Sequence, residues 1–200
     1  QLEHEYFPRA FEAANPGRVV GELRERTLAS PDVAGDLIAA EWREALRACK
    51  GTALRVETYE LDVDALELGV HRAVRLFSAV SSNCQVRRLQ PRAGNRHAVF
   101  LVSPGEALTY HYELDLREPV VRPDPRVAHT LNLHVDEQGN VLQSIAVVYP
   151  RAGRHVDATL PEGIEVQIAA VQRETHLVYT ETRHTNDVID SSVHRLRVPC

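Results

Sequence analysis

Short strand-like runs separated by turn residues fill most of the chain after residue 53, and this rhythm restricts the fold more than any other feature. The stretch HVDEQGNVLQS, residues 134–144, is an example, because Gly139-Asn140 separates two apolar runs. Gly and Asn tolerate the left-handed backbone region, so this pair favours a hairpin. Short strands at spacings of about 8–20 residues, with few helices, predict an antiparallel β architecture.

The expected strands are rich in β-branched and aromatic residues that broadly alternate with polar ones. They cover residues 54–61, 84–89, 97–103, 107–114, 129–135, 141–149 and 174–182. Turns are expected between them, including Ser81–Cys84 and Ser103-Pro104-Gly105. Residues 73–80 and 162–171 fit either a helix or a strand, because periodicity alone does not resolve short apolar runs.

Residues 141–149 carry apolar side chains on both faces of the expected strand. A strand that is apolar on both sides is usually covered on both sides. A chain of 200 residues has limited material for both covers. We therefore expect part of this surface to meet the rest of a larger protein.

One clear helical pattern precedes the strands, over residues 36–49. Its apolar residues recur at three- and four-residue spacing, which predicts one buried stripe. The stripe consists of Leu37, Ile38, Trp42, Ala45, Leu46 and Cys49. Glu41 and Glu44 fall mostly on the solvent side, and Gly51 is expected to end the helix. A short helix at 18–27 and a helix start at Ser30-Pro31 are further expectations.

These patterns divide the chain into an N-terminal helical segment, residues 1–52, and an antiparallel β domain, residues 53–200. The predicted fold class is mainly β with one or two short helices. With 44% hydrophobic and 26% charged residues, the chain is expected to be globular. It contains no methionine, so we expect it to be a piece of a longer polypeptide or a processed one.

Composition argues against several classes of partner. The net charge is −5, with both signs interspersed, which gives no reason to expect nucleic acid or direct binding to an anionic membrane. No apolar run approaches the roughly 20 residues of a membrane-spanning helix. The three cysteines are far apart with no CxxC, so free thiols are expected rather than a disulfide framework or a zinc site.

The motifs of catalytic chemistry are missing from the sequence. There are ten histidines, but no HExxH, and His129 and His134 are expected to point to opposite faces of one strand. There is also no GxSxG and no Gly-rich phosphate loop. We therefore predict no catalytic residues, no metal ligands and no cofactor.

Three stretches, taken in order, resemble the middle-to-C-terminal segment of the B component of bacterial Tc (ABC-type) insecticidal toxin complexes. They are residues 88–113, 124–142 and 180–199, and residues 44–62 lend support. Together they run over about three-quarters of the chain, and the ordered set is far more specific than any single motif. The chain departs from the usual family pattern at Leu61-Asp62-Val63, where a Leu-Asp-Gly turn is common, and at 74–81.

The residues that carry the resemblance are expected to have structural roles. They are Arg88, Leu89, Gln90, Pro91, Arg92, Asn95, Arg96, His97, Tyr110, His111, Tyr112, Glu113, Asp136, Gly139, Asn140, Thr185 and Asn186.

The resemblance implies that the chain joins flanking domains of its own longer polypeptide, a C component with Rhs/YD repeats and a pore-forming A component. B and C together would form a hollow β shell around the toxic C-terminal part of C. His134-Val135-Asp136 then looks like a degenerate Tyr-x-Asp unit. The family also implies assembly in the bacterial cytoplasm and secretion as part of a toxin complex.

Two other functions stay open. One is a stand-alone toxin enzyme, such as an ADP-ribosyltransferase-like effector, with His97, His111 and Glu113 as candidate residues. It would need a cleft with perturbed ionisable groups. The other is a receptor- or glycan-binding β module, although a single tryptophan cannot form a sugar platform by itself.

Overall fold

The computed structural model describes residues 28–69, 73–115, 120, 123–151, 153, 159–161 and 163–200, and the helix predicted at 18–27 lies outside them. The elements are β1 (Asp32–Val33), α2 (Ala39–Ala48), β2 (Arg55–Leu61), α3 (Val63–Glu67), β3 (Ala73–Gln90), β4 (Val99–Asp115), β5 (Arg126–Val135), β6 (Val141–Val148), α4 (Ile164–Gln172), β7 (His176–Glu181), β8 (Val188–Ile189) and β9 (His194–Arg195). In the described part of the chain, no helix has the length and apolar character needed to cross a membrane.

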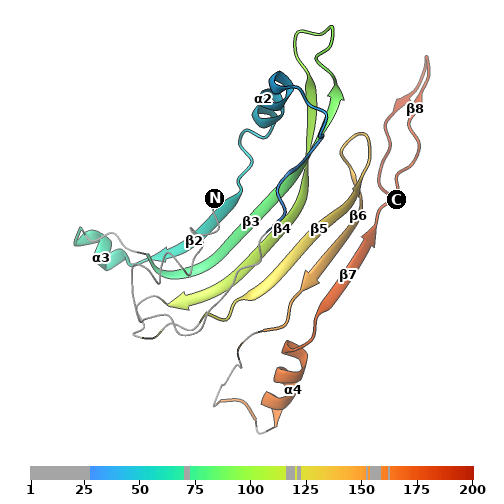
Figure 1. Cartoon of the computed structure of the whole chain (residues 1–200). Helices are drawn as coiled ribbons and strands as arrows, with labels where there is room; N and C mark the ends of the chain where they lie inside the picture. The colour runs from blue at the N-terminus through green and yellow to red at the C-terminus, as the bar shows by residue number, and fades with distance from the viewer. Residues whose placement is uncertain are drawn as a thin grey trace.

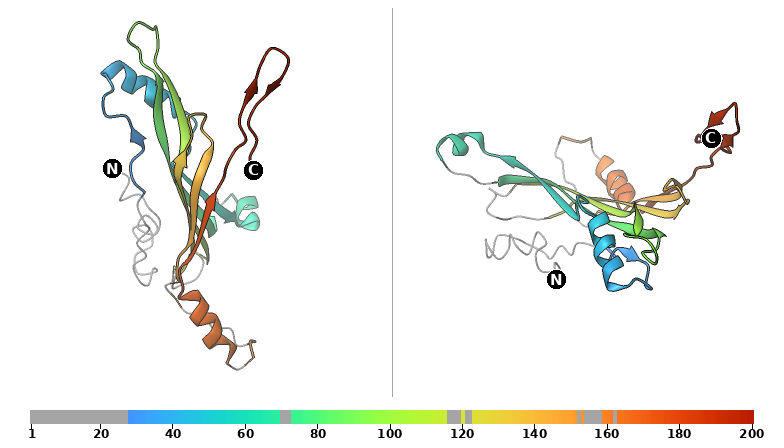
Figure 2. Two further views of the ribbon diagram at one scale, coloured as in Figure 1. Left: turned by 90° about the vertical axis from the view of Figure 1, so that its right-hand side faces the viewer. Right: turned by 90° about the horizontal axis from the view of Figure 1, so that it is seen from above.

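Seven strands of the described chain form one curled sheet (Figure 1), which confirms the predicted mainly β, antiparallel fold. Their order is β1-β3-β4-β5-β6-β7, and β2 pairs with β3 beside β1. All neighbours are antiparallel except β1 and β3. Seen from above, α2 and α4 lie on opposite sides of the sheet (Figure 2). The small β8–β9 hairpin projects from the end that follows β7 (Figure 1).

Two expected turns are wrong, because Ser81–Cys84 lies inside β3 and Ser103-Pro104-Gly105 lies inside β4. At this point Ser82 pairs with Ala107 and Cys84 with Pro104, so one residue of β3 faces two of β4. This β-bulge accepts Pro104 and Gly105 without ending the strand.

Asn83 occupies the bulge. Its side-chain oxygen accepts a hydrogen bond from the Glu106 N–H at 2.6 Å, and its Nδ2 donates to the Ala29 carbonyl at 3.0 Å. A polar side chain thus bonds a backbone N–H of the bulge and a carbonyl of the segment before β1.

The helix predicted at 36–49 is confirmed but begins at Ala39, and its predicted buried stripe is only partly correct. Leu37 and Ala45 are buried, whereas Ile38, Trp42 and Leu46 are exposed. The face toward the sheet instead contains Glu41, which is 3% exposed.

Three other segments of uncertain structure are now assigned. Ser30-Pro31 starts no helix, because the chain extends there into β1 and pairs with β3. The open segment 73–80 is strand, and 162–171 falls mainly in α4. The domain boundary at residue 52 stays a prediction, although β1 joins the same sheet as the later strands.

Among the described residues, two apolar clusters form the core. One consists of Leu76, Ala79, Leu108, Tyr110, Tyr112 and Leu114. The other lies under α2 and consists of Leu37, Ala45, Cys84 and Val86. In β6, Val147 is buried but Val148 is 48% exposed, so the described residues cover the two faces of this strand unequally.

We expect Gly105→Ala to destabilise the chain by about 1–3 kcal/mol in urea unfolding, because overpacking costs this much. An added Cβ would lie 2.5 Å from the Asn83 Oδ1. Gly94→Ala is the matched control, since nothing lies within 4 Å of its added Cβ. A Gly105→Ala variant as stable as the control would contradict the described bulge.

Candidate functional site

The tip of the β3–β4 hairpin contains the first group of predicted motif residues. Gln90 Nε2 donates to the His97 carbonyl at 3.2 Å, and Asn95 Nδ2 donates to the Pro91 carbonyl at 3.0 Å. These bonds close the loop on itself. Leu89 is half exposed and Arg96 is exposed.

Glu41 of α2 binds this tip from the side. Its carboxylate accepts bonds from Arg88 Nη1 at 3.0 Å and from the Arg92 N–H at 2.7 Å. It also accepts the Ile38 N–H at 3.4 Å, which caps the start of α2. Through its other terminal nitrogen, Nη2, Arg88 forms an ion pair with Asp36. One buried carboxylate therefore joins the helix start, β3 and the loop.

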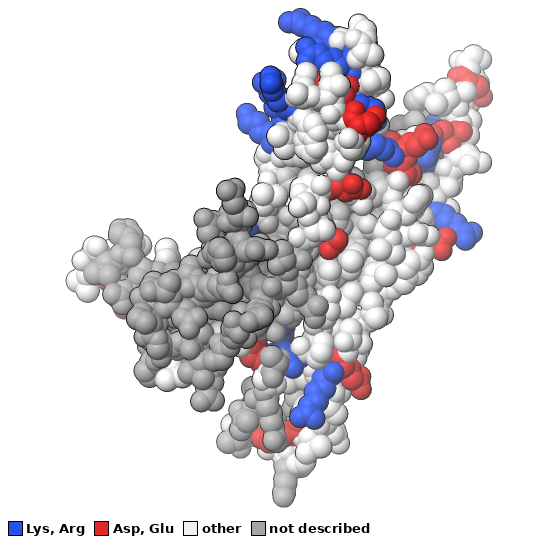
Figure 3. Space-filling view, viewed as in Figure 1, with Lys and Arg blue, Asp and Glu red and all other residues white. Residues whose placement is uncertain are grey.

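Glu44, one helical turn later, makes the second attachment. It accepts the Ala98 N–H at 2.9 Å and contacts His97 Nδ1 at 3.0 Å. Arg92 Nη1 lies 3.7 Å away. We call Asp36, Glu41, Glu44, Arg88 and Arg92 the tip clamp. Charged side chains gather at this upper end of the molecule (Figure 3).

The surroundings favour the charged form of each group of the tip clamp whose pKa is shifted. The Arg92 N–H, chiefly, lowers the pKa of Glu41, and the Ala98 N–H followed by His97 lowers that of Glu44. Hydrogen bonding to Asp36 raises the pKa of Arg88. Sequence reasoning placed Glu41 and Glu44 in solvent, so it missed the partners of the motif arginines.

The β5–β6 hairpin predicted at Gly139-Asn140 is confirmed. Asp136 Oδ1 accepts the N–H groups of Gln138 and Asn140 at 2.9 and 2.8 Å, and Asn140 Nδ2 donates to its Oδ2 at 2.9 Å. The Asn140 side chain is the main cause of a lowered Asp136 pKa. Gly139 has φ +93°, which suits glycine.

The third motif group approaches the same turn from the C-terminal segment. Arg197 lies 2.7 Å from Asp187 and 3.6 Å from Asp136, and it donates to Gln138 at 3.0 Å. Thr185 bonds the backbone of Val198 through its N–H at 2.9 Å and its hydroxyl at 3.1 Å. Asn186, between Thr185 and Asp187, is exposed.

The β3–β4 hairpin also reaches this turn, from the other side. Arg87, next to Arg88 of the clamp, donates to the Glu137 carbonyl. The Leu101 side chain of β4 lies 3.4 Å from the position of a Cβ on Gly139. Residues from three separate stretches of sequence therefore meet at one end of the sheet.

The tyrosine motif lies farther along β4. Tyr110 and Tyr112 are buried and their rings stack, with centroids 5.9 Å apart, whereas His111 between them is exposed. The Glu113 side chain lies outside the described residues. His97 precedes β4 and His111 lies near its other end, up to about 46 Å along the strand at about 3.3 Å per residue. The structure thus does not bring these two enzyme candidates together.

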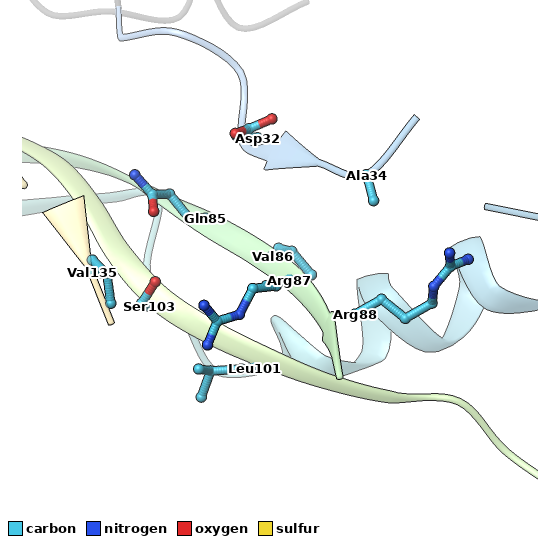
Figure 4. Close-up of a pocket in the computed structure, with 9 residues that line it drawn as sticks. All are labelled: Asp32, Ala34, Gln85, Val86, Arg87, Arg88, Leu101, Ser103 and Val135. Carbon is cyan, nitrogen blue, oxygen red and sulfur yellow. The ribbon is translucent and has the colours of Figure 1, made fainter. Parts of the chain in front are cut away.

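A hollow of about 370 Å³ opens beside the clamp (Figure 4). It is lined by Asp32, Ala34, Gln85, Val86, Arg87, Arg88, Leu101, Ser103 and Val135. In Figure 4, Arg87 points toward Leu101 and Ser103, while Arg88 points toward α2. Both arginines already have partners, and among the described residues that line the hollow there is no histidine to activate Ser103.

Three side chains form a hydrogen-bonded row that the sequence did not predict. They come from β4, from β5 and from the residue that follows β6. His129 lies between Glu106, at 3.2 Å from its Nε2, and the Tyr149 hydroxyl, at 3.0 Å from its Nδ1. His134 does not take part in these two bonds. Among the described residues, no group of three or more His, Cys, Asp or Glu is placed to hold a metal ion.

The last strand of the sheet, β7, leaves one edge open. It pairs with β6 on one side, and no strand in the described part of the chain pairs with its other side. All six of its residues are exposed, and Leu177, Val178 and Tyr179 are 64%, 61% and 53% exposed. Such an apolar edge is a template for pairing with another strand.

Comparison with known proteins agrees with this geometry. Residues 44–197 match the family described as the insecticide toxin TcdB middle/C-terminal region. The chain belongs to this family, which confirms the resemblance to the Tc toxin B component. No curated protein matches the chain.

Three solved structures share the fold. A crystal structure of TcdB2-TccC3-Cdc42 matches with TM-score 0.55 and 28% identity over 78% of this chain. A crystal structure of TcdB2-TccC3 gives 0.58 and 27% over 82%, and a Photorhabdus luminescens Tc holotoxin pore with a mutated TccC3 gives 0.57 and 27% over 90%. This chain spans 7% to 8% of the length of those chains.

The lowered pKa values of the clamp predict a pH dependence. A carboxylate whose pKa falls below its ordinary 4.5 on folding stabilises the fold above that value, and the contribution is lost as pH falls through the folded pKa. In Glu41→Gln, the unfolding free energy should therefore fall less between about pH 7 and about pH 3 than in the parent chain. Urea unfolding at both pH values measures this.

Glu67→Gln, in the exposed end of α3, removes the same charge without touching the clamp. It should keep the pH dependence of the parent. If Glu41→Gln also keeps it, Glu41 does not contribute as a charged group.

Asp136→Ala should release the C-terminal segment as well as weaken its own turn, because Asp136 binds both Asn140 and Arg197. Hydrogen exchange at the Thr185 and Arg197 amides should become faster. Glu137→Ala removes an exposed acid from the same turn and should leave this exchange nearly unchanged. Equal effects of the two substitutions would show that net charge, and not the Asp136 contacts, holds the segment.

Proposed function

We propose that this chain is a non-catalytic structural segment of a Tc toxin B component. It would contribute to a β shell that encloses the toxic C-terminal part of the C component. Membership of the TcdB middle/C-terminal family and likeness to chains of TcdB2-TccC3 complexes support this role. The partners follow from it: flanking domains of the same longer chain, a C component, and an A component as in the holotoxin pore.

The open edge of β7 is the observation that carries the proposal. An apolar edge strand normally carries a charge or a proline, or is covered by another element, because otherwise it pairs with other chains. Within the part of the chain that the structure describes, the central Leu177-Val178-Tyr179 of β7 has none of these. A sheet that continues into a neighbouring segment would make use of this edge.

The motif residues fit a structural part in such a wall. The tip clamp and the Asp136 turn fix the end of a long curled sheet at which three stretches of sequence meet. Their charged groups are used in bonds to backbone and to one another. We further propose that the complex assembles in the bacterial cytoplasm and acts as a secreted toxin.

Val178→Lys should reduce association of the chain with itself or with the segments that flank it in the complete protein, because a lysine on an edge strand opposes pairing. Size-exclusion chromatography with light scattering measures this on the chain alone and in mixtures. Val166→Lys in α4 is the control, since Val166 is 68% exposed but lies outside the sheet.

Association that is retained in Val166→Lys and lost in Val178→Lys supports a wall segment joined through β7. A parent chain that stays monomeric and ignores the flanking segments contradicts the proposal. An equal loss in both variants would indicate nonspecific hydrophobic association and would also count against the proposal.

A further inference from the structure

Two cysteines that are 35 residues apart in sequence lie together under α2. Cys49 caps the C-terminal end of α2, and Cys84 lies in β3, within the second apolar cluster. Their sulfur atoms are 3.9 Å apart. Both are free thiols; Cys84 is buried and Cys49 is partly accessible. The third cysteine, Cys200, is exposed.

We propose that Cys49 and Cys84 form a reversible disulfide by exchange with a low-molecular-weight disulfide such as oxidised glutathione. A disulfide needs the sulfur atoms to close from 3.9 Å to about 2.05 Å, a shift that would take rotation of the side chains and a small movement of the helix end. Cys49 supports this because it lies in the terminal turn of α2, where the chain leaves the helix.

The exchange balances in two steps. The Cys49 thiolate attacks one sulfur of oxidised glutathione, which forms a mixed disulfide and releases one glutathione thiolate. The Cys84 thiolate then attacks the Cys49 sulfur and releases the second. The two protein thiols lose two electrons and two protons, and one glutathione disulfide is reduced to two thiols.

The environments of the thiols assign the order of the steps. The attacking species is a thiolate that the dissolved disulfide can reach. The accessible thiol, Cys49, therefore reacts first. Cys84 is 4% exposed, and burial followed by its contact with Cys49 raises its pKa. Cys84 is therefore placed to resolve the mixed disulfide from inside the core.

The bond would add a covalent attachment to a helix that ion pairs hold near its start. The tip clamp binds α2 through Glu41 and Glu44, whereas Cys49 lies at the opposite end. The cross-link would close a loop that contains β2 and α3. Closing a loop restricts the unfolded chain and so stabilises the folded one.

The test incubates the complete chain, folded and without denaturant, in glutathione buffers with an increasing oxidised share. After alkylation of the remaining thiols, peptide mass spectrometry reads the linkages. We expect Cys49 and Cys84 to lose reactivity together and to appear as one linked pair, while Cys200 appears only as the alkylated or glutathione-bound thiol. The linked form should unfold at a higher urea concentration, and dithiothreitol should reverse both effects.

Three controls sharpen the result. Cys200→Ser should leave the pair unchanged, and Cys84→Ala should stop the reaction at a glutathione adduct on Cys49. A urea-unfolded sample should scramble all three cysteines, which separates proximity in the fold from mere reactivity. The proposal is overturned if both thiols stay alkylatable in the most oxidised buffer, or if the Cys49 adduct accumulates in the parent chain without passing to Cys84.

Discussion

The pairing of β3 with β4 is the interaction on which the rest of the structure depends. The two strands are 18 and 17 residues long, and their register runs from Arg75↔Asp115 to Gln90↔Val99. Both apolar clusters include residues of this pair, and α2 packs against it. Strands this long exceed the usual range of about 3–10 residues, and irregularities such as the bulge at Asn83 let a strand bend. The tip clamp then fixes the loop that joins them.

The two edges of the sheet are defined by which strands still have unpaired backbone hydrogen-bonding groups. The outer edge of β3 is shared by β1 and β2, which cover different parts of it. On the other side the sheet grows through β5 and β6 to β7, whose exposed outer edge has no partner strand among the described residues. Unpaired edge groups need water or another strand. The same physical requirement that organises the sheet underlies our proposal that it continues into a neighbouring segment.

Much of this organisation could be predicted from the sequence, because hairpins and alternation are local signals. The strands near 54–61, 129–135 and 141–149, and the turn at Gly139-Asn140, follow from their own residues. The continuity of β4 through Pro104-Gly105 could not be predicted, because it depends on Asn83, more than twenty residues earlier. The burial of Glu41 likewise depends on Arg88, across the fold. A helix wheel places Glu41 beside Leu37 and Ala45, but only the arginine-rich tip shows why a carboxylate belongs on that face. The ordered motifs predicted the family, whereas the hydrogen-bond and ion-pair partners of the motif residues became known only from the structure.

The most direct measurement of the central claim is hydrogen exchange at the β7 amides, in the isolated chain and in the longer protein that we propose contains it, bound to a C component. If β7 joins a continuous wall, the amides that face β6 should be protected in both samples. The amides on the open edge should exchange fast in the isolated chain and slowly in the complex. Equally fast exchange of the open-edge amides in both samples would show that the sheet ends at β7, and would contradict the account of this chain as a segment of a shell.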